Sequence, residues 1–391
     1  MFFFRASRVL LLNFSTILES SVQKFSTILE HKEQSSKARR RTPNNSGIEY
    51  IVDKPQMSTM RFFIALSLIG SSIAQQPYVL LCLGQSNMAW PVSKSAHAKE
   101  TLAAANQLGD RLVSYDENMR RVPFKSTSAV CLNAALELNN HNATMINLAV
   151  GGSRIEEWTA PDGYLYKTKL AKVAHLDVDN VLWYQGESNT VNYMEYADLS
   201  VHFFKQLRGY YPRADIHLVE LAGYRSKSTA LDGTTGVTIT AELRAAQRES
   251  AARLSPYVHT VSAIDLGNRR NVHPKNKRDV GKRLAMSIRG QYDEPVVTGF
   301  TNGNTVTFSE PVMVRKWKKR QKTSAIEYFD GRAWRATRIT RIVGNTVTIV
   351  PSKRPRKGTP PITKIRVMWT SWVQSPILSV RLPHVPVVPF E

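Results

Sequence analysis

The sequence predicts a three-layer α/β fold with a mostly parallel sheet, followed by a small antiparallel β module. In the first part of the chain, five apolar runs of strand length each precede a stretch of helix-forming composition, which is typical of β-α units with right-handed crossovers. From residue 296 onward, apolar and polar residues alternate between turn signals, as in antiparallel strands. Asp293-Glu294-Pro295 is the natural boundary between the two parts.

Each predicted strand of the first part is an apolar run bounded by polar residues, which fits a strand covered on both faces. These strands are expected at 78–83, 145–150, 180–185, 216–221 and 258–264. Gly84 allows a sharp turn after the first strand. Helices are expected at 96–108, at 126–140 with a serine or threonine cap, and at 196–208, 239–254 and 275–289. The stretch 111–125 is predicted to be irregular.

The C-terminal part has four alternating stretches, at 296–308, 325–334, 344–350 and 364–369. Asn302-Gly303, Asp330-Gly331 and Gly344-Asn345 separate them as hairpin turns. We therefore expect an antiparallel β-sandwich over 296–391, behind an α/β domain over 76–292.

The composition is that of a globular protein. The chain has 391 residues, 42% of them apolar, which is enough for two cores. Its net charge of +22 is concentrated in residues 296–391, which hold seven Lys and ten Arg against four acidic residues. Such a basic surface attracts nucleic acid or anionic glycans, although a solvated face explains it as well. Cys82 and Cys131 form no zinc or redox motif, so we expect a fold independent of disulfides, with Cys82 in the core.

The N-terminal region contains a secretory signal pattern. Residues 60–74 combine one basic residue, an apolar run, and small residues at Ser72 and Ala74 where a signal peptidase cuts. Residues 1–59 are expected to be a disordered leader or an extension of the gene model. If translation starts at Met60, the protein is expected to be secreted or lysosomal, in keeping with the glycosylation sequon at Asn142; if it starts at Met1, the destination stays open. No stretch reaches the roughly 20 apolar residues of a membrane span.

Residues with reactive or hydrogen-bonding groups follow successive predicted strands. Parallel strands deliver the residues that follow them to one edge of the sheet, so these side chains are expected to meet although they are far apart in the chain. They are Ser86, Gly152, Gln185, Glu187 and His273.

Ser86 is the candidate nucleophile. A serine reacts only when a base removes its proton and donors stabilise the resulting oxyanion. His273 is the candidate base, and the amides of Ser86 and Gly152 and the side chain of Gln185 are candidate donors. The second residue after Ser86 is Met88, which argues against the Gly-x-Ser-x-Gly elbow of α/β-hydrolases.

Five ordered blocks resemble the SGNH hydrolases, and more narrowly the carbohydrate esterases that include sialate O-acetylesterase. The similar blocks are Gly84-Gln-Ser-Asn-Met88, Val150-Gly-Gly-Ser-Arg-Ile-Glu-Glu-Trp158, Leu182-Trp-Tyr-Gln-Gly-Glu-Ser-Asn189, Glu242-Leu-Arg-Ala-Ala-Gln247 and Val272-His-Pro-Lys-Asn-Lys277. The resemblance covers about residues 77–391. It implies a flavodoxin-like sheet and hydrolysis of O-acetyl esters on sugars, without a metal or other cofactor, through a Ser/His/acid triad and an acetyl-enzyme.

The acid of the triad is left open by the sequence. Related proteins often have an aspartate where this chain has Asn268, and an acidic residue where it has Asn271. Glu187 and Asp265 are the two candidates to orient His273. Loss of the acid matters, because Asp-to-Asn in the serine-protease triad, a worked example of this effect, costs about 10⁴ in turnover.

Further residues are candidates for holding a substrate. Asn87 belongs to the nucleophile block and is a candidate for oxyanion or substrate binding. Aromatic rings stack on sugar faces, and the loop aromatics are Trp158, Tyr164 and Tyr166. An arginine pairs well with a sialic carboxylate, and the candidates are Arg154, Arg225 and Arg244.

The sequence supports three functional hypotheses. The first is a secreted esterase acting on acetylated carbohydrates, most readily sialic acids, with acetylxylan as the alternative substrate. The second is a glycan-binding protein with weakened catalysis, suggested by Asn268 and Asn271. The third, nucleic-acid binding through the basic module, lacks any recognised binding motif and conflicts with a secretory leader, so no nucleic-acid partner is expected. Neither oligomeric state nor the hydroxyl position follows from the sequence.

Overall fold

The computed structural model describes residues 78–390 except 139–141, 226–227, 237, 316–321, 354–360 and 383–384. These residues lie within one compact unit, residues 74–391. The predicted leader (1–59) and signal peptide (60–74) lie outside the described residues. Among the described helices, none combines the length and apolar character that a membrane span requires.

A six-stranded parallel sheet forms the centre of the first domain, in the order β2-β3-β1-β4-β5-β6. Its strands are β1 (Tyr78–Gly84), β2 (Leu112–Tyr115), β3 (Ala143–Asn147), β4 (Asn180–Tyr184), β5 (Asp215–Glu220) and β6 (Val258–Ser262). The prediction of a mixed α/β domain with a parallel sheet is confirmed. The prediction that 111–125 is irregular is wrong, because β2 adds an edge strand there.

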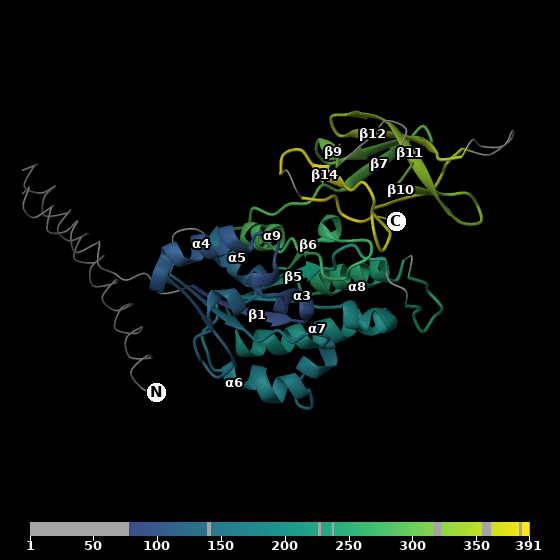
Figure 1. Ribbon diagram of the computed structural model, residues 1–391. Coiled ribbons are helices and arrows are strands. Elements are labelled where there is room, and N and C mark those ends of the chain that lie inside the picture. The colour runs from purple at the N-terminus through teal and green to yellow at the C-terminus, as the bar shows by residue number, and fades with distance from the viewer. Residues whose placement is uncertain are drawn as a thin grey trace, which may run out of the picture. The chain divides into compact units, whose positions relative to one another are not determined.

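Helices cover both faces of this sheet (Figure 1). One layer holds α4 (Ala98–Leu108), α5 (Ala129–Glu137) and α9 (Arg278–Ile288), and the other holds α7 (Tyr193–Tyr210) and α8 (Ile239–Arg253). The predicted serine cap is present on α5, where the Ser128 side chain accepts a hydrogen bond from the Cys131 amide. The three layers bring all carboxyl strand ends to one edge.

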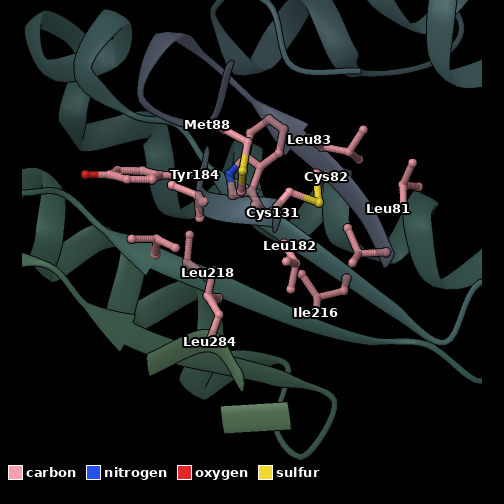
Figure 2. Close-up of a cluster of buried hydrophobic side chains, with 14 of the residues drawn as sticks. Leu81, Cys82, Leu83, Met88, Cys131, Leu182, Tyr184, Ile216, Leu218 and Leu284 are labelled. Atoms are coloured by element: carbon pink, nitrogen blue, oxygen red, sulfur yellow. A yellow bond between two sulfur atoms is a disulfide. The ribbon is translucent and has the colours of Figure 1, made fainter. Parts of the chain in front are cut away.

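The central strand β1 is buried along most of its length. Leu80, Leu81, Cys82 and Leu83 are fully inaccessible to solvent. Figure 2 shows Leu81, Cys82 and Leu83 in one cluster with side chains of β4, β5 and α9. A side chain at Gly84 would overlap the carbonyl oxygen of Tyr184, and its φ of +130° is one that residues with a side chain rarely adopt. Glycine is therefore required where β1 turns into the next element.

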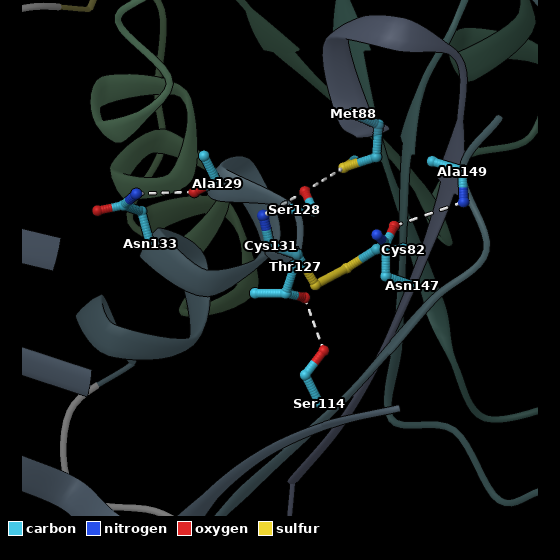
Figure 3. The surroundings of a disulfide bond; sticks show 10 residues. All are labelled: Cys82, Met88, Ser114, Thr127, Ser128, Ala129, Cys131, Asn133, Asn147 and Ala149. Atoms are coloured by element: carbon cyan, nitrogen blue, oxygen red, sulfur yellow. Dashed lines mark hydrogen bonds between the residues drawn. A yellow bond between two sulfur atoms is a disulfide. The ribbon is translucent and has the colours of Figure 1, made fainter. Parts of the chain in front are cut away.

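The two cysteines form a disulfide, which corrects the expectation of a fold independent of one. Cys82 of β1 is bonded to Cys131 of α5, with Cα atoms 6.3 Å apart (Figure 3). The predicted core position of Cys82 is right, since both cysteines are fully buried. The bond ties the strand before Ser86 to a covering helix.

Antiparallel strands form the C-terminal module, as predicted. A six-stranded sheet has the order β13-β10-β11-β12-β8-β7, and β14 (Ile377–Ser379) pairs with β9 (Val312–Val314). The larger sheet consists of β7 (Val297–Thr301), β8 (Thr305–Phe308), β10 (Lys322–Phe329), β11 (Trp334–Val343), β12 (Thr346–Pro351) and β13 (Ile365–Val367). Both sheets contribute to one buried cluster. The sandwich form stays a prediction, because the second described sheet has only two short strands.

Candidate active site

Ser86 and His273 meet at the carboxyl edge of the parallel sheet. Ser86 begins the one-turn helix α3 (Ser86–Ala89) directly after β1, and His273 lies in the loop between β6 and α9. Their Oγ and Nε2 atoms are 2.8 Å apart. This is hydrogen-bond distance for a hydroxyl that gives its proton to an imidazole. The sequence-predicted pair is thus brought together from positions 187 residues apart.

The imidazole of His273 is held by its surroundings. The Trp90 ring stacks on it with a centroid distance of 5.2 Å and an angle of 25° between the planes. The backbone amide of His273 donates to Asn271 Oδ1 at 2.9 Å. Burial, and after it the charge of Lys277, lower the pKa of His273. Both effects favour the neutral ring that a general base requires.

Backbone amides lie close to Ser86. As the first residue of α3, Ser86 has an amide without an intrahelical acceptor. The Gly151 backbone lies beside the Ser86 side chain, since a Cβ on Gly151 would be 3.7 Å from the Ser86 Cβ. Gly152 follows with a φ of +76°. Among the described residues, neither the Ser86 amide nor the Gly152 amide has a backbone acceptor.

Gln185 does not fit the predicted oxyanion role. Its Nε2 donates to the Ser153 carbonyl at 3.0 Å and to Asn189 Oδ1 at 2.7 Å, and its Oε1 accepts from the Tyr196 hydroxyl. Both amide protons are therefore used within the fold, and Gln185 is fully buried. Its observed role is to hold the loops that follow β3 and β4 together.

Asn87 is also saturated, which corrects the prediction that it contacts substrate. The side chain is fully buried, and its Nδ2 donates to Glu187 Oε1 and, at 3.0 Å, to the Val272 carbonyl. Its Oδ1 accepts a hydrogen bond from Lys277 Nζ. Asn87 thus links the nucleophile segment to the residue before His273.

Glu187 lies close to the catalytic pair but forms no hydrogen bond with His273 in the described residues. One carboxylate oxygen accepts from Asn87, and the other is buried without a hydrogen-bond partner. Burial raises the pKa of Glu187, opposed by the Asn87 bond and by the charge of Lys277. The ring nitrogen Nδ1 of His273 has no described carboxylate partner.

Asp265 is placed in a structural ion pair, away from the histidine ring. Its carboxylate binds Arg283 at 2.6 and 2.9 Å and Arg315 at 2.7 Å, and its side chain is fully buried. Arg315 belongs to the C-terminal module. The prediction that Asp265 orients His273 is therefore wrong: its oxygens neutralise two arginines instead.

Asn268 and Asn271 shape the loop before the histidine. Asn268 Oδ1 accepts from the amides of Arg270 and Asn271, at 2.9 and 3.1 Å. Asn271 accepts from the His273 backbone rather than from its ring. Neither residue therefore acts as a third member of a triad in this structure.

Two predicted substrate contacts are buried instead. Trp158 is fully buried, donates to Ser153 Oγ and packs edge-on against Trp183, so it offers no ring face to a sugar. Arg244 is 1% exposed, and its guanidinium binds the carbonyls of Leu221 and Thr370. Both predictions are corrected by burial.

The remaining aromatic and arginine candidates differ in exposure. Tyr164 is 67% exposed, whereas Tyr166 stacks on Tyr210. Arg225 is exposed. The half-exposed Arg154 donates to the Ser188 carbonyl and pairs with Glu156 at 2.8 Å.

Lys277 and Trp90 were not assigned a role from sequence. Lys277 is 1% exposed, and burial lowers its pKa to about 7, although the Glu187 carboxylate favours the charged form. The signal in the sequence that could have identified Lys277 is its position four residues after the histidine, at the end of the segment Val272–Lys277. Within the described residues, no group of three or more His, Cys, Asp or Glu side chains is arranged to hold a metal ion.

Two comparisons with known proteins found similar proteins, and a third found none. The family model described as "Carbohydrate esterase, sialic acid-specific acetylesterase" matches residues 76–289, more than half of the chain. No curated protein sequence matches significantly.

One solved structure shares the fold over most of the chain, and a second matches a smaller part of it. A carbohydrate acetylesterase from Xanthomonas citri is similar over 80% of this chain and 80% of its own, with 22% identity and a TM-score of 0.65. A protein from Arabidopsis thaliana is similar over 56% of this chain and 100% of its own, with 18% identity and a TM-score of 0.42. The matched 80% of this chain is more residues than the part that precedes the β module contains. The similarity to the Xanthomonas enzyme therefore includes part of the β module.

Proposed function

The chain belongs to the carbohydrate esterase family of sialic acid-specific acetylesterases, and from this premise we propose that it is a serine esterase that removes O-acetyl groups from sialic acids. The observation that carries the proposal is the 2.8 Å contact between Ser86 Oγ and His273 Nε2. A nucleophile and a base at this distance are the minimum that acyl transfer requires.

In the proposed mechanism, Ser86 Oγ attacks the acetyl carbonyl while His273 Nε2 takes the hydroxyl proton. The backbone amides of Ser86 and Gly152 donate hydrogen bonds to the tetrahedral oxyanion and stabilise it. The imidazolium then protonates the sugar oxygen as the ester bond breaks, which leaves an acetyl-serine. Water, deprotonated by the same ring, releases acetate and restores Ser86.

The proposed preference for sialic acids depends on Arg154. It follows the Gly151-Gly152 turn beside Ser86, and its side chain is 43% exposed. A guanidinium here would pair with the carboxylate of a sialic acid but find no partner on acetylxylan. Its bond to Glu156 competes with this use, so the effect of Arg154 has to be measured against a neutral substrate.

A secreted or lysosomal location is proposed from two observations. The predicted signal peptide at 60–74 directs the chain to the secretory pathway. The Cys82–Cys131 disulfide fits an oxidising compartment.

Acetate release from O-acetylated sialic acid, acetylxylan and p-nitrophenyl acetate tests the proposal. Wild-type protein is expected to hydrolyse acetylated sialic acid with the highest kcat/KM, and Ser86→Ala to lose about 10⁴-fold on every substrate. Arg154→Met should raise KM for the sialic acid substrate alone. Activity on acetylxylan only would assign the alternative substrate. No acetate from any substrate, with no labelling of Ser86 by a fluorophosphonate, would favour a glycan-binding protein.

A further inference from the structure

A buried polar network lies behind the catalytic pair, made of Asn87, Lys277 and Glu187. Asn87 is its centre, because its oxygen accepts from Lys277 and its nitrogen donates to Glu187. An ammonium only donates and a carboxylate only accepts, so these partners fix which way the amide points.

Asn87 also sets the distance between the catalytic segments. It follows Ser86 directly, and its Nδ2 donates at 3.0 Å to the carbonyl of Val272, the residue before His273. One fully buried side chain therefore connects the neighbours of the nucleophile and of the base.

The Lys277 ammonium lies against two aromatic rings. Its Nζ is 5.7 Å from the centroid of Trp90 and 5.9 Å from that of Tyr184. Trp90 is the same ring that stacks on His273. Ring faces and the Glu187 carboxylate both favour a charged ammonium at this place.

The charged and titratable groups around this ammonium come from every neighbouring element. Tyr184 is contributed by β4, Glu187 by the turn after it, and His273 by the loop before α9. Among the described groups, Lys277 is the cation that acts on the His273 ring, and no described carboxylate offsets it at Nδ1.

We propose that Lys277 is a positioning residue whose ammonium, anchored by Asn87 and balanced by Glu187, opposes protonation of His273 and so sets the lower pH limit of catalysis. This inference rests on the proposed esterase function. It assigns Glu187 to the ammonium rather than to the histidine.

Lys277 is charged in the pH range in which His273 titrates. Its pKa of about 7 means that the ammonium is largely formed at the acidic pH where an imidazole titrates. A cation there lowers the pKa of His273, so the neutral base survives to lower pH. Above pH 7 the ammonium is lost, but the imidazole is by then already neutral.

The test is a titration of the His273 ring by NMR, assigned with His273→Gln, in wild type, Lys277→Met and Lys275→Met. Lys275 is the matched control, because it is an exposed lysine two residues from the histidine. Lys277→Met should raise the His273 pKa by roughly 0.5 to 1, whereas Lys275→Met should leave it nearly unchanged because solvent screens its charge. The acid limb of kcat/KM for p-nitrophenyl acetate should move by the same amount.

Equal shifts in both variants, or none in Lys277→Met, would overturn the inference. If Lys277→Met does not fold, Lys277→Gln takes its place and should raise the His273 pKa in the same way; a wild-type pKa at or above the ordinary value of 6.5 would also overturn the inference. Glu187→Gln separates the two roles of the carboxylate. In the network Glu187 keeps Lys277 charged, so its loss discharges the ammonium and should raise the His273 pKa. A triad acid predicts instead a roughly 10⁴-fold loss of kcat at every pH. Because NMR needs no turnover, an inactive protein would refute the proposed function without affecting this test.

Discussion

Loss of the Cys82–Cys131 disulfide should destabilise the protein without touching its catalytic groups. The bond joins residues 49 positions apart, and so closes a large loop in the unfolded chain. In the chain-entropy treatment, a loop of this length corresponds to about 4 kcal/mol of unfolding free energy. The disulfide shares no residue with the hydrogen bond between Ser86 and His273, so breaking it does not remove a catalytic group.

This free energy translates into a measurable shift in Tm. A folded unit of somewhat more than 300 residues has an unfolding entropy near 0.65 kcal/mol/K, so 4 kcal/mol corresponds to roughly 6 °C. Replacement by alanine adds a small cavity cost, because both cysteines are fully buried.

Thermal unfolding with and without dithiothreitol measures the effect, for wild type and for Cys82→Ala/Cys131→Ala. Wild type should lose roughly 6 °C on reduction, and the double variant should not respond to the reductant. Thiol titration in denaturant should find no free thiol before reduction and two after it. If two free thiols are found before reduction and the Tm does not change with dithiothreitol, the disulfide is refuted. One argument for a secreted location is then lost as well.

Three further predictions concern the site and its support. Gly84→Ala should cost roughly 2 to 5 kcal/mol of stability, seen as a lower urea midpoint, because a Cβ would overlap the Tyr184 carbonyl and φ is +130°; an unchanged midpoint would contradict the turn. Asp265→Asn should lower stability by about 3 to 5 kcal/mol because the buried Arg283 loses the negative charge that neutralises it, while kcat of the folded fraction stays within a few-fold of wild type; a large loss of kcat would restore Asp265 as the triad acid. The acid limb of the pH–kcat/KM profile should have its midpoint below 6.5, because a lowered pKa keeps His273 neutral to lower pH; a midpoint above 7 would exclude it.

The sequence predicted the layers because β1, β4 and their neighbours are continuous apolar runs, a strong signal for buried parallel strands. It missed β2, since Leu112–Tyr115 is short and lies at the sheet edge with a half-buried pattern. Sequence also placed Ser86 and His273 together, because the topology of parallel strands alone decides which strand ends meet.

The sequence did not predict which polar residues face inward. Trp158, Gln185 and Arg244 belong to the sequence blocks that predicted the site, yet all three are buried and hydrogen-bonded in the fold. Side-chain direction at a strand end depends on loop geometry, which a short motif does not encode. The disulfide was within reach of the sequence, because two cysteines in a chain with a predicted secretory signal are an expected pair.

Two buried carboxylates, Asp265 and Glu187, illustrate why chemistry cannot be assigned from residue type alone. Asp265 carries a carboxylate, but two arginines surround it, and it serves to join the α/β domain to the β module through Arg315. Glu187 carries the same group, but one of its oxygens binds an amide and the other has no partner, so its charge remains available to Lys277. What distinguishes them is the number of cations within reach, which burial and not sequence position determines. Among the described groups, the charge of Lys277 acts on His273 and no carboxylate binds its ring, which favours the neutral imidazole and limits how strongly its charged form is stabilised.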